Sequence, residues 1–238
     1  MKMKKIIFTG GTGRFGNVFK KIQHKYKIYY PSKKVLNIKK LENIENYVKT
    51  IKPDYLIHCA ALSRPMKIHD TDINKSIDLN IIGTSNIVKI CNKFKIKLIY
   101  FSSNYVYSGQ KGNYNEDSPL LPFLNYGWSK LGGECAVRMY KNSLILRICM
   151  TEKPFIHKKA FSDLKTNFMY QEDLANVLLK LINKKGILNV GGKMQSVYNF
   201  AKKNNRKITK ISAKKKYGKS YPLNQYMNVK KFFKIIKG

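Results

Sequence analysis

Acidic side chains are scarce in this sequence: 13 Asp and Glu residues stand against 47 Lys and Arg residues among 238, a formal net charge of +34. An excess of this kind is typical of proteins that bind nucleic acid or another polyanion. Almost all of the charge is lysine, however, whereas nucleic-acid sites favour the bidentate contacts of arginine. The lysines are also spread along the whole chain. We therefore interpret the charge as a compositional bias, expect no nucleic-acid partner, and note that a positive field would suit an anionic substrate.

Long apolar runs are absent. No stretch of ~18 apolar residues occurs, so no helix is expected to span a membrane. The first five residues resemble the basic start of a signal peptide, but only Ile6, Ile7 and Phe8 follow before a pair of glycines. A signal peptide needs ~7–15 apolar residues at this point. The sequence predicts a cytoplasmic protein without a membrane partner.

Cysteine and histidine are few and far apart, with four of each. There is no Cys-x-x-Cys pair and no group of histidines near a cysteine, which argues against a disulfide scaffold and a zinc site. We expect reduced, mostly packed thiols and no metal. The cysteines are Cys59, Cys91, Cys135 and Cys149.

Short β-like runs alternate with helical patterns along the chain. Several of the runs are continuously apolar, as strands covered on both faces must be. Alternation of this kind predicts an α/β fold with right-handed crossovers and a doubly wound parallel sheet. The expected strands are residues 4–9, 26–30, 55–59, 97–102, 143–148 and 187–190, and the expected helices are 17–25, 41–51, 76–94, 126–140, 172–183 and 197–203.

Regular β–α units end near residue 150. We expect residues 1–150 to form a nucleotide-binding domain. Residues 151–238 contain shorter and less regular pieces, and we expect them to form a small substrate-binding portion, interleaved with the end of the sheet, at its carboxyl edge.

A glycine-rich loop follows the first expected strand and opens a helix. It fits both G-x-x-G-x-x-G and G-x-G-x-x-G. Glycine suits a tight turn whose backbone approaches a pyrophosphate, and the helix that follows offers free N–H groups to the phosphates. In this position the loop predicts dinucleotide binding in a Rossmann-type fold. The cofactor contacts expected from it are Gly10, Gly13, Arg14, Phe15 and Gly16.

The end of the second expected strand indicates which dinucleotide is preferred. NAD sites usually carry an acid there, which bonds the ribose hydroxyls. This sequence has Ser32, Lys33 and Lys34 and no acid. A hydroxyl and lysines suit a 2′-phosphate, so Ser32 and Lys33 favour NADP(H), although NAD(H) is the alternative if the lysines belong only to the general excess.

A tyrosine and a lysine stand four residues apart on one expected helix, at Tyr126 and Lys130, and Ser103 follows the end of an apolar strand. A tyrosine can protonate a carbonyl oxygen while hydride reaches the carbon, and a serine hydroxyl can hold the same oxygen. A tyrosine that works near neutral pH needs its pKa lowered, and a neighbouring ammonium would do so. The three residues form the candidate catalytic set.

The motifs occur in an order and spacing that resemble the extended short-chain dehydrogenase/reductases, and within them the dTDP-4-dehydrorhamnose reductase branch, which also includes NAD-dependent epimerases. The resemblance is specific through residue 148 and weaker beyond it. The motifs are the glycine loop, Pro53-Asp54, His58-Cys59-Ala60-Ala61, Asn80-x-x-Gly83-Thr84, Ser102-Ser103-Asn104-Tyr105-Val106-Tyr107, Tyr126-Gly127-Trp128-Ser129-Lys130 and Gly133-Glu134.

The resemblance implies roles for single residues. Tyr126 would be the acid/base, Lys130 would bind the nicotinamide ribose, and Ser103 would position the carbonyl. Ala60 and Ala61 would line the cofactor, and Asn80 would support the site from its helix. The expected substrate contacts are Ser63, Asn104 and Arg147.

Two departures from the family bear on the substrate. Asn104 stands where the reductases usually have Asp, and only a short segment separates Arg147 from Asn167, where the family has a longer excursion. The substrate pocket is therefore expected to be trimmed. It would be open, altered, or completed by a second subunit in a homodimer.

The leading interpretation is an NADPH-dependent reductase of a nucleotide-activated 4-keto-6-deoxysugar, with hydride delivered to C4 and Tyr126 as the proton donor. One alternative is a sugar-nucleotide epimerase that retains NAD. Another is a non-catalytic NADP-binding subunit that regulates a partner.

Overall fold

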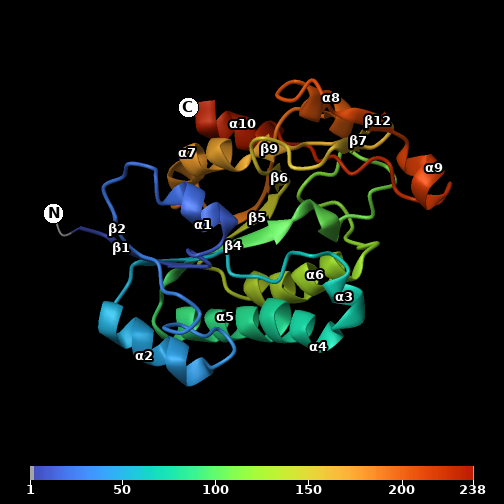
Figure 1. Cartoon of the computed structure of the whole chain (residues 1–238). Helices are drawn as coiled ribbons and strands as arrows, with labels where there is room; N and C mark the ends of the chain where they lie inside the picture. Colours follow the sequence, from blue (N-terminus) through green and yellow to red (C-terminus); the bar gives the residue numbers. More distant parts are fainter. Residues whose placement is uncertain (1–2, 238) are drawn as a thin grey trace.

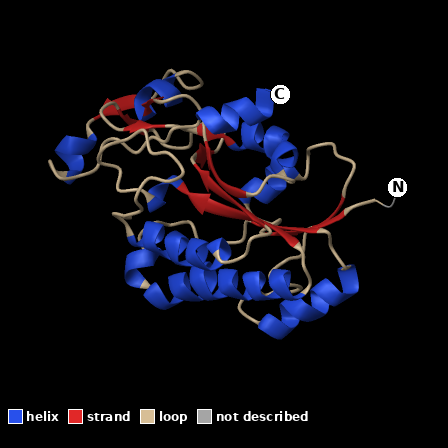
Figure 2. Cartoon of the chain, turned by 180° about the vertical axis from the view of Figure 1, so that it is seen from behind, coloured by secondary structure: helices blue, strands red, loops and turns tan. Residues whose placement is uncertain are grey.

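A six-stranded parallel sheet runs through the middle of the computed structural model, which describes residues 3–237 (Figures 1 and 2). The strand order across the sheet is β10-β5-β4-β3-β1-β2, and every neighbouring pair is parallel. The strands are β1 (Lys5–Thr9), β2 (Lys27–Tyr29), β3 (Tyr55–His58), β4 (Lys97–Ser103), β5 (Ser143–Ile148) and β10 (Gly186–Val190). All six expected strands are present, with ends that differ by one residue at most.

Helices cover both faces of the sheet, and the apolar strands explain why. Ile6 and Phe8 of β1 belong to the core on one face, and Ile7 between them belongs to the core on the other. Because successive side chains of a strand point to opposite faces, a strand between two layers of helices must be apolar throughout. The doubly wound α/β fold is confirmed.

The two helical layers are separate in Figure 1, one below the sheet and one above it. The lower layer contains α2 (Leu41–Ile51), α5 (Gly83–Lys93) and α6 (Asn125–Arg138). The upper layer contains α1 (Arg14–Phe19), α7 (Gln171–Leu181) and α10 (Lys230–Lys237).

Two helix predictions differ from the structure. The helix expected at residues 17–25 is wrong in its bounds, because α1 starts at Arg14 directly after the glycine loop and ends at Phe19. The long helix expected at 76–94 is divided: α3 (Ile68–Thr71) and α4 (Ile73–Ser76) precede a π-helical stretch at Ile77–Ile82, and only then α5 begins.

Residues beyond 150 divide between the sheet and a small portion at its carboxyl edge. β10 joins the sheet, and α7 and α10 pack against one of its faces. A separate apolar cluster that includes Phe155, Leu164 and Ile208 forms the core of the small portion. Its elements are β6 (Met150–Thr151), β7 (Lys159–Phe161), β8 (Lys165–Thr166), β9 (Met169–Tyr170), β11 (Gln195–Ser196), α8 (Val197–Lys202), β12 (Thr209–Ile211) and α9 (Ala213–Tyr217).

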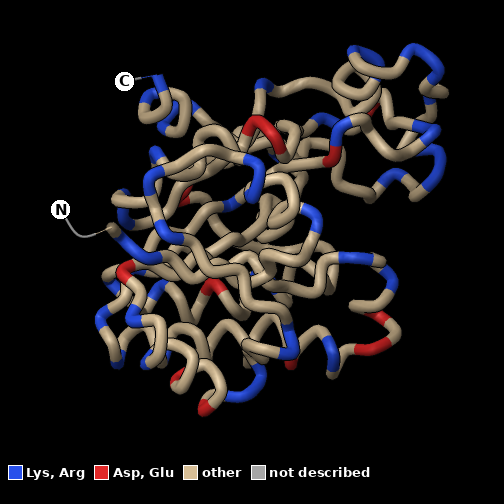
Figure 3. The backbone as a smooth tube through the Cα atoms, turned by 60° about the vertical axis from the view of Figure 1, so that its left-hand side comes forward, with Lys and Arg blue, Asp and Glu red and all other residues tan. Residues whose placement is uncertain are grey.

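Basic residues are spread over both parts of the molecule, as the blue segments of Figure 3 show. Within residues 3–237, no helix combines the length and the apolar character needed to cross a membrane. Each of the four cysteines, all inside that range, is free.

Candidate active site

A cavity of about 1520 Å³ opens at the carboxyl ends of the strands, between the sheet and the small C-terminal portion. Thr9 at the end of β1, Ser103 at the end of β4 and Ile148 at the end of β5 all line it. The chain leaves β1 toward β2 on one side and returns to β3 on the other. Ligands of open α/β sheets bind at such a reversal, where the crossovers leave a crevice.

The glycine loop forms one wall of the cavity. Gly10 has a φ of +77°, and a Cβ atom there would lie 2.7 Å from the backbone nitrogen of Ala60. A side chain at this position would meet both backbone strain and a collision. The loop and the residues after β3 therefore lie too close together for a side chain at Gly10, and Gly10, Gly13, Ala60 and Ala61 all line the cavity.

Tyr126 and Lys130 lie in the first two turns of α6 and also line the cavity, together with Ser103. Asn80 joins this end of the helix to the segment that follows β3. Its amide nitrogen donates to Ser129 Oγ at 2.8 Å and to the carbonyl of Leu62 at 2.9 Å, and its oxygen accepts from Leu62 N at 2.7 Å. The catalytic set predicted from the sequence is thus brought together around one cavity.

The electrostatics of the tyrosine differ from the expectation. Burial raises the pKa of Tyr126 above its usual value, and the Ser103 side chain beside it opposes this in part. The sequence predicted that a neighbouring ammonium would lower this pKa. In the structure burial, which disfavours the phenolate, outweighs the opposing charges of Arg64 and Arg14. Tyr126 therefore keeps its proton at neutral pH.

Lys130 is also buried, and burial lowers its pKa to about 8. Its Nζ atom lies 4.4 Å from the centre of the Tyr100 ring, and the Tyr100 hydroxyl donates to the Lys130 carbonyl at 3.1 Å. The aromatic face stabilises the ammonium, which lies close to the middle of its titration at pH 8.

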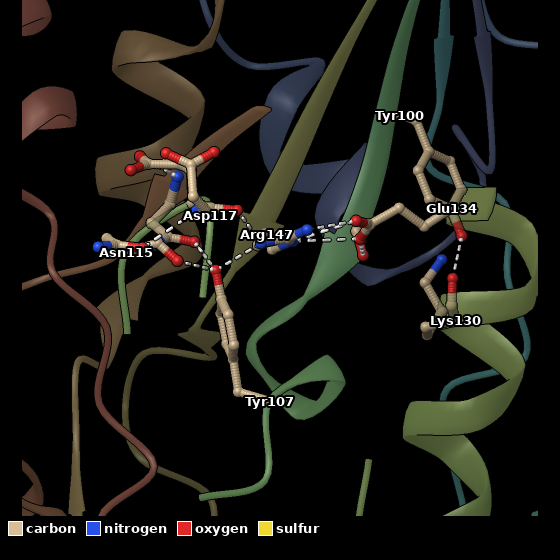
Figure 4. A network of polar contacts seen from close by, with 10 residues as sticks. Tyr100, Tyr107, Asn115, Asp117, Lys130, Glu134 and Arg147 are labelled. Carbon is tan, nitrogen blue, oxygen red and sulfur yellow. Dashed lines mark hydrogen bonds and ion pairs between the residues drawn. The ribbon is translucent and has the colours of Figure 1, made fainter. Parts of the chain in front are cut away.

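Arg147 does not reach the cavity, so the prediction that it contacts substrate is not supported by its position. Its side chain is 1% exposed and lies against Glu134, as Figure 4 shows. It also donates to Tyr107 Oη at 2.6 Å and to the Glu116 carbonyl at 2.8 Å. Arg147 is the last but one residue of β5, and its side chain is directed into the packing between the strand and α6 rather than beyond the strand's end.

Ser63 and Asn104, the other expected substrate contacts, line the cavity. Ser63 Oγ accepts a hydrogen bond of 3.2 Å from Arg14, which joins an expected substrate residue to an expected cofactor residue. Asn104 donates to the Gln225 carbonyl at 3.4 Å and so lies against the C-terminal portion.

Only some of the remaining expected cofactor residues line the cavity. Lys33 and Phe15 line the cavity, whereas Ser32 and Gly16 are not among its described lining residues. Gly16 is packed beneath the loop, where a Cβ atom would lie 2.5 Å from Gly11.

Two arginines and a glutamate that line the cavity form ion pairs that the sequence did not predict. Arg64 makes two bonds to Glu152, at 2.8 and 3.2 Å, and Arg14 Nε lies 3.4 Å from the same carboxylate. The rarity of acids in the sequence was the one signal that could have directed attention to Glu152.

The C-terminal portion supplies a second unforeseen set, of basic and aromatic side chains. Tyr217 and Tyr221 stack with ring centres 4.5 Å apart beside Lys216. Lys158 and Lys159 line the same part of the cavity. No motif marks these residues in the sequence.

The chain is similar to proteins of known family. The family model described as "RmlD substrate binding domain" matches residues 3–154. Methionine adenosyltransferase 2 subunit beta of Xenopus laevis is 31% identical over 155 residues, which are 61% of this chain and 46% of the relative. The chain thus spans about half the length of that relative.

Solved structures match nearly the whole chain. The structure of dTDP-4-dehydrorhamnose reductase from Bacillus anthracis str. Ames in complex with NADP has a TM-score of 0.87 at 23% identity, and the match covers 98% of this chain and 92% of that one. The structure of dTDP-4-dehydrorhamnose reductase from Yersinia enterocolitica has a TM-score of 0.81 at 25% identity, with 95% and 91% covered. The C-terminal portion therefore shares its fold with these proteins.

Proposed function

The chain belongs to the RmlD substrate binding domain family, and on this premise we propose that it is an NADPH-dependent reductase of a nucleotide-activated 4-keto-6-deoxysugar. The resemblance inferred from the motifs is confirmed by this membership. The observation that carries the proposal is that Ser103, Tyr126 and Lys130 line the same cavity as the glycine loop.

The described residues fit a nicotinamide dinucleotide. Gly10 and Gly13 present bare backbone to the cavity. Lys33 also lines it and would pair with a 2′-phosphate, and Lys130 lies one helical turn from Tyr126. The volume of about 1520 Å³ exceeds what a single small ligand needs and suits a cofactor with a second molecule. When bound, the reduced cofactor supplies a hydride for the carbonyl carbon.

The chain's own residues supply the proton and the orientation. A phenol whose pKa lies at or above its usual value is protonated at neutral pH, so the Tyr126 hydroxyl can donate to the substrate oxygen as the C=O electron pair moves onto that atom. The Ser103 hydroxyl would hold the same oxygen. The product is an alcohol whose new C–H bond comes from the hydride and whose O–H proton comes from Tyr126.

The far end of the cavity supports an anionic, nucleotide-bearing substrate. Lys158, Lys159 and Lys216 provide cations for a diphosphate, and the Tyr217–Tyr221 pair provides an aromatic surface for a base. These contacts come from the small portion that the sequence predicted to be trimmed.

A second candidate is a cofactor-binding subunit without turnover. It is favoured by the 31% identity to a protein named as a subunit of methionine adenosyltransferase 2. The complete Ser103, Tyr126 and Lys130 set favours the reductase, because a purely regulatory subunit has no need of a proton donor at the cavity.

The test is NADPH oxidation by the purified protein against a panel of 4-keto-6-deoxysugar nucleotides, followed by absorbance. The proposal expects oxidation only when a keto substrate is added, and loss of it in Tyr126→Phe. Tight cofactor binding with no oxidation across the panel would instead identify the regulatory subunit. Protein purified with NAD already bound, and active in interconverting sugar nucleotides, would identify an epimerase.

A further inference from the structure

A second cavity, of about 410 Å³, lies at the amino edge of the sheet, opposite the candidate active site. Because the strands are parallel, their first residues meet at this edge. Tyr55 begins β3 and Lys97 begins β4, while Lys4 and Lys185 immediately precede β1 and β10, and all four line this cavity. Sequence motifs did not mark it.

Lys97 is the unusual residue of the group. The residue is only 8% exposed, and its Nζ atom has no hydrogen-bond partner among the residues that the structure describes. A buried ammonium without a partner is costly, because it loses its hydration and gains nothing in return. Burial, together with a smaller effect of the Lys185 charge, lowers the pKa of Lys97 to about 8.

The one carboxylate in the cavity is already engaged. Asp54 Oδ1 lies 2.6 Å from Lys4 Nζ, and its other oxygen accepts from Lys5 N at 2.8 Å. Lys95 and Lys185 form no ion pair with any residue in the range 3–237, and both line the cavity with Lys97. Apart from the Lys4–Asp54 pair, the cavity is therefore lined by three lysines and no further carboxylate among the described residues.

We propose that this cavity is a binding site for a small oxyanion, a phosphate or sulfate group, anchored by Lys97. The anion would supply the counter-charge that the protein does not, and Lys95 and Lys185 at the rim would hold its remaining oxygens. The amide side chains of Asn142 and Asn183, which also line the cavity, are of the kind that complete the donor set of such sites. Nζ of Lys97 is covered, so contact requires rotation about the last bonds of its flexible side chain.

Sulfate is the appropriate probe because it does not titrate near neutral pH. Thermal unfolding is measured with sodium sulfate and with sodium chloride at equal ionic strength, and sulfate binding is measured by calorimetry. We expect sulfate to raise the unfolding temperature of the parent protein more than chloride does, and this excess to be smaller in Lys97→Met, because exclusion of sulfate from the surface acts on both proteins and binding at the site only on the parent. In Lys97→Met the calorimetric affinity should fall by about tenfold or more. The matched control is Lys25→Met, an exposed lysine outside both cavities, which should behave as the parent protein.

Proton uptake distinguishes this site from general screening of a basic protein. With a pKa of about 8, Lys97 is half protonated at pH 8, so sulfate binding should take up about half a proton. Calorimetry in two buffers of different ionisation enthalpy measures this number. In Lys97→Arg, which keeps its charge at every accessible pH, binding should persist without proton uptake, and this variant serves if Lys97→Met does not fold.

Equal sulfate affinity in the parent, Lys97→Met and Lys25→Met would overturn the proposal, because the anion would then act through bulk charge. Glucose 1-phosphate distinguishes the two sources of the group. Tighter binding of the sugar phosphate than of sulfate, lost in Lys97→Met, assigns the site to a phosphorylated metabolite. The reverse order assigns it to a free inorganic anion.

Discussion

Nη2 of Arg147 lies 2.7 Å from Oε1 of Glu134, and the two side chains are 1% and 0% exposed. The pair joins β5 to α6, the helix that carries Tyr126 and Lys130. Ser102 Oγ donates to the other carboxylate oxygen at 2.6 Å, so the end of β4 is tied to the same point. This buried pair therefore sets how the strand ends and the helix of the candidate catalytic residues lie relative to each other.

Removal of one partner should be strongly destabilising. In Arg147→Met the Glu134 carboxylate is left buried without its cation, and we expect a loss of about 3–5 kcal/mol in the free energy of unfolding, measured by urea denaturation. The control is Lys39→Met, which breaks an exposed pair with Asp78 and should cost at most ~1 kcal/mol. The double variant Arg147→Met/Glu134→Leu should recover part of the loss. Equal costs for the buried and the exposed pair would show that the network is not structural.

Tyr126→Phe should abolish chemistry and spare cofactor binding. Loss of the proton donor is expected to lower kcat by about 10²–10⁴-fold. Most of the expected cofactor contacts come from other residues, such as the glycine loop and Lys130. Loss of the Tyr126 hydroxyl should therefore leave the dissociation constant for NADPH nearly unchanged. Steady-state kinetics and fluorescence titration measure the two quantities. Tyr198→Phe, outside the cavity, is the matched control and should leave both unchanged. Undiminished turnover in Tyr126→Phe would rule out the proposed role.

The activity should fall as the pH rises through about 8. Burial lowers the pKa of Lys130 to about 8, so its ammonium is present below that pH and lost above it. Burial raises the pKa of Tyr126, so the proton donor remains intact over the same range. The pH profile of kcat/KM should therefore be level below about pH 8 and decline above it. A rate that increases through pH 8 would indicate that deprotonated Lys130 is the active form.

Gly10→Ala should distort the glycine loop where it forms one wall of the cavity. Gly186→Ala is the control for backbone strain alone. Both glycines have positive φ, +77° and +85°, which costs an L-residue about 1–2 kcal/mol. Only at Gly10 would the new Cβ meet another backbone, the nitrogen of Ala60 at 2.7 Å, whereas nothing lies within 4 Å at Gly186. We expect Gly10→Ala to lose more stability than Gly186→Ala and to weaken NADPH binding. Gly186→Ala should bind NADPH as the parent does.

Lys33 should favour NADPH over NADH. It lines the cavity, whereas its neighbour Lys34 is equally exposed but does not. A charge-assisted hydrogen bond to a 2′-phosphate is worth about 1.5–3 kcal/mol, so Lys33→Ala should weaken NADPH binding by about tenfold or more and leave NADH binding unchanged. Lys34→Ala should change neither. If the two variants behave alike, the lysines at this strand end belong to the general lysine excess.

The features that the sequence predicted well are local. The strand from Lys97 to Ser103, the loop around Gly10 and the spacing of Tyr126 and Lys130 each depend on side-chain type and periodicity within one segment. Apolar runs covered on both faces leave few arrangements other than a doubly wound sheet. The fold and the position of the candidate site at the carboxyl edge could therefore be inferred without coordinates.

The features that the sequence did not determine depend on contacts between distant segments. Arg147 is the last but one residue of a strand whose end lines the cavity, yet its guanidinium pairs with Glu134, because a buried charge must be paired. The Tyr126 pKa rises because burial outweighs the nearby positive charges. Burial depends on the packing of segments from the whole chain around the phenol.

Local geometry and short-range sterics govern the order of strands and helices, the glycine loop and the spacing of the candidate catalytic residues, so these features could be derived from the sequence. Contacts between distant segments govern which walls close the cavity and where the Arg147 side chain lies. They also bury Lys97 at the opposite edge without a hydrogen-bond partner among residues 3–237. Each of these outcomes depends on the balance of desolvation and charge pairing among residues far apart in the chain, and that balance exists only once the chain is folded.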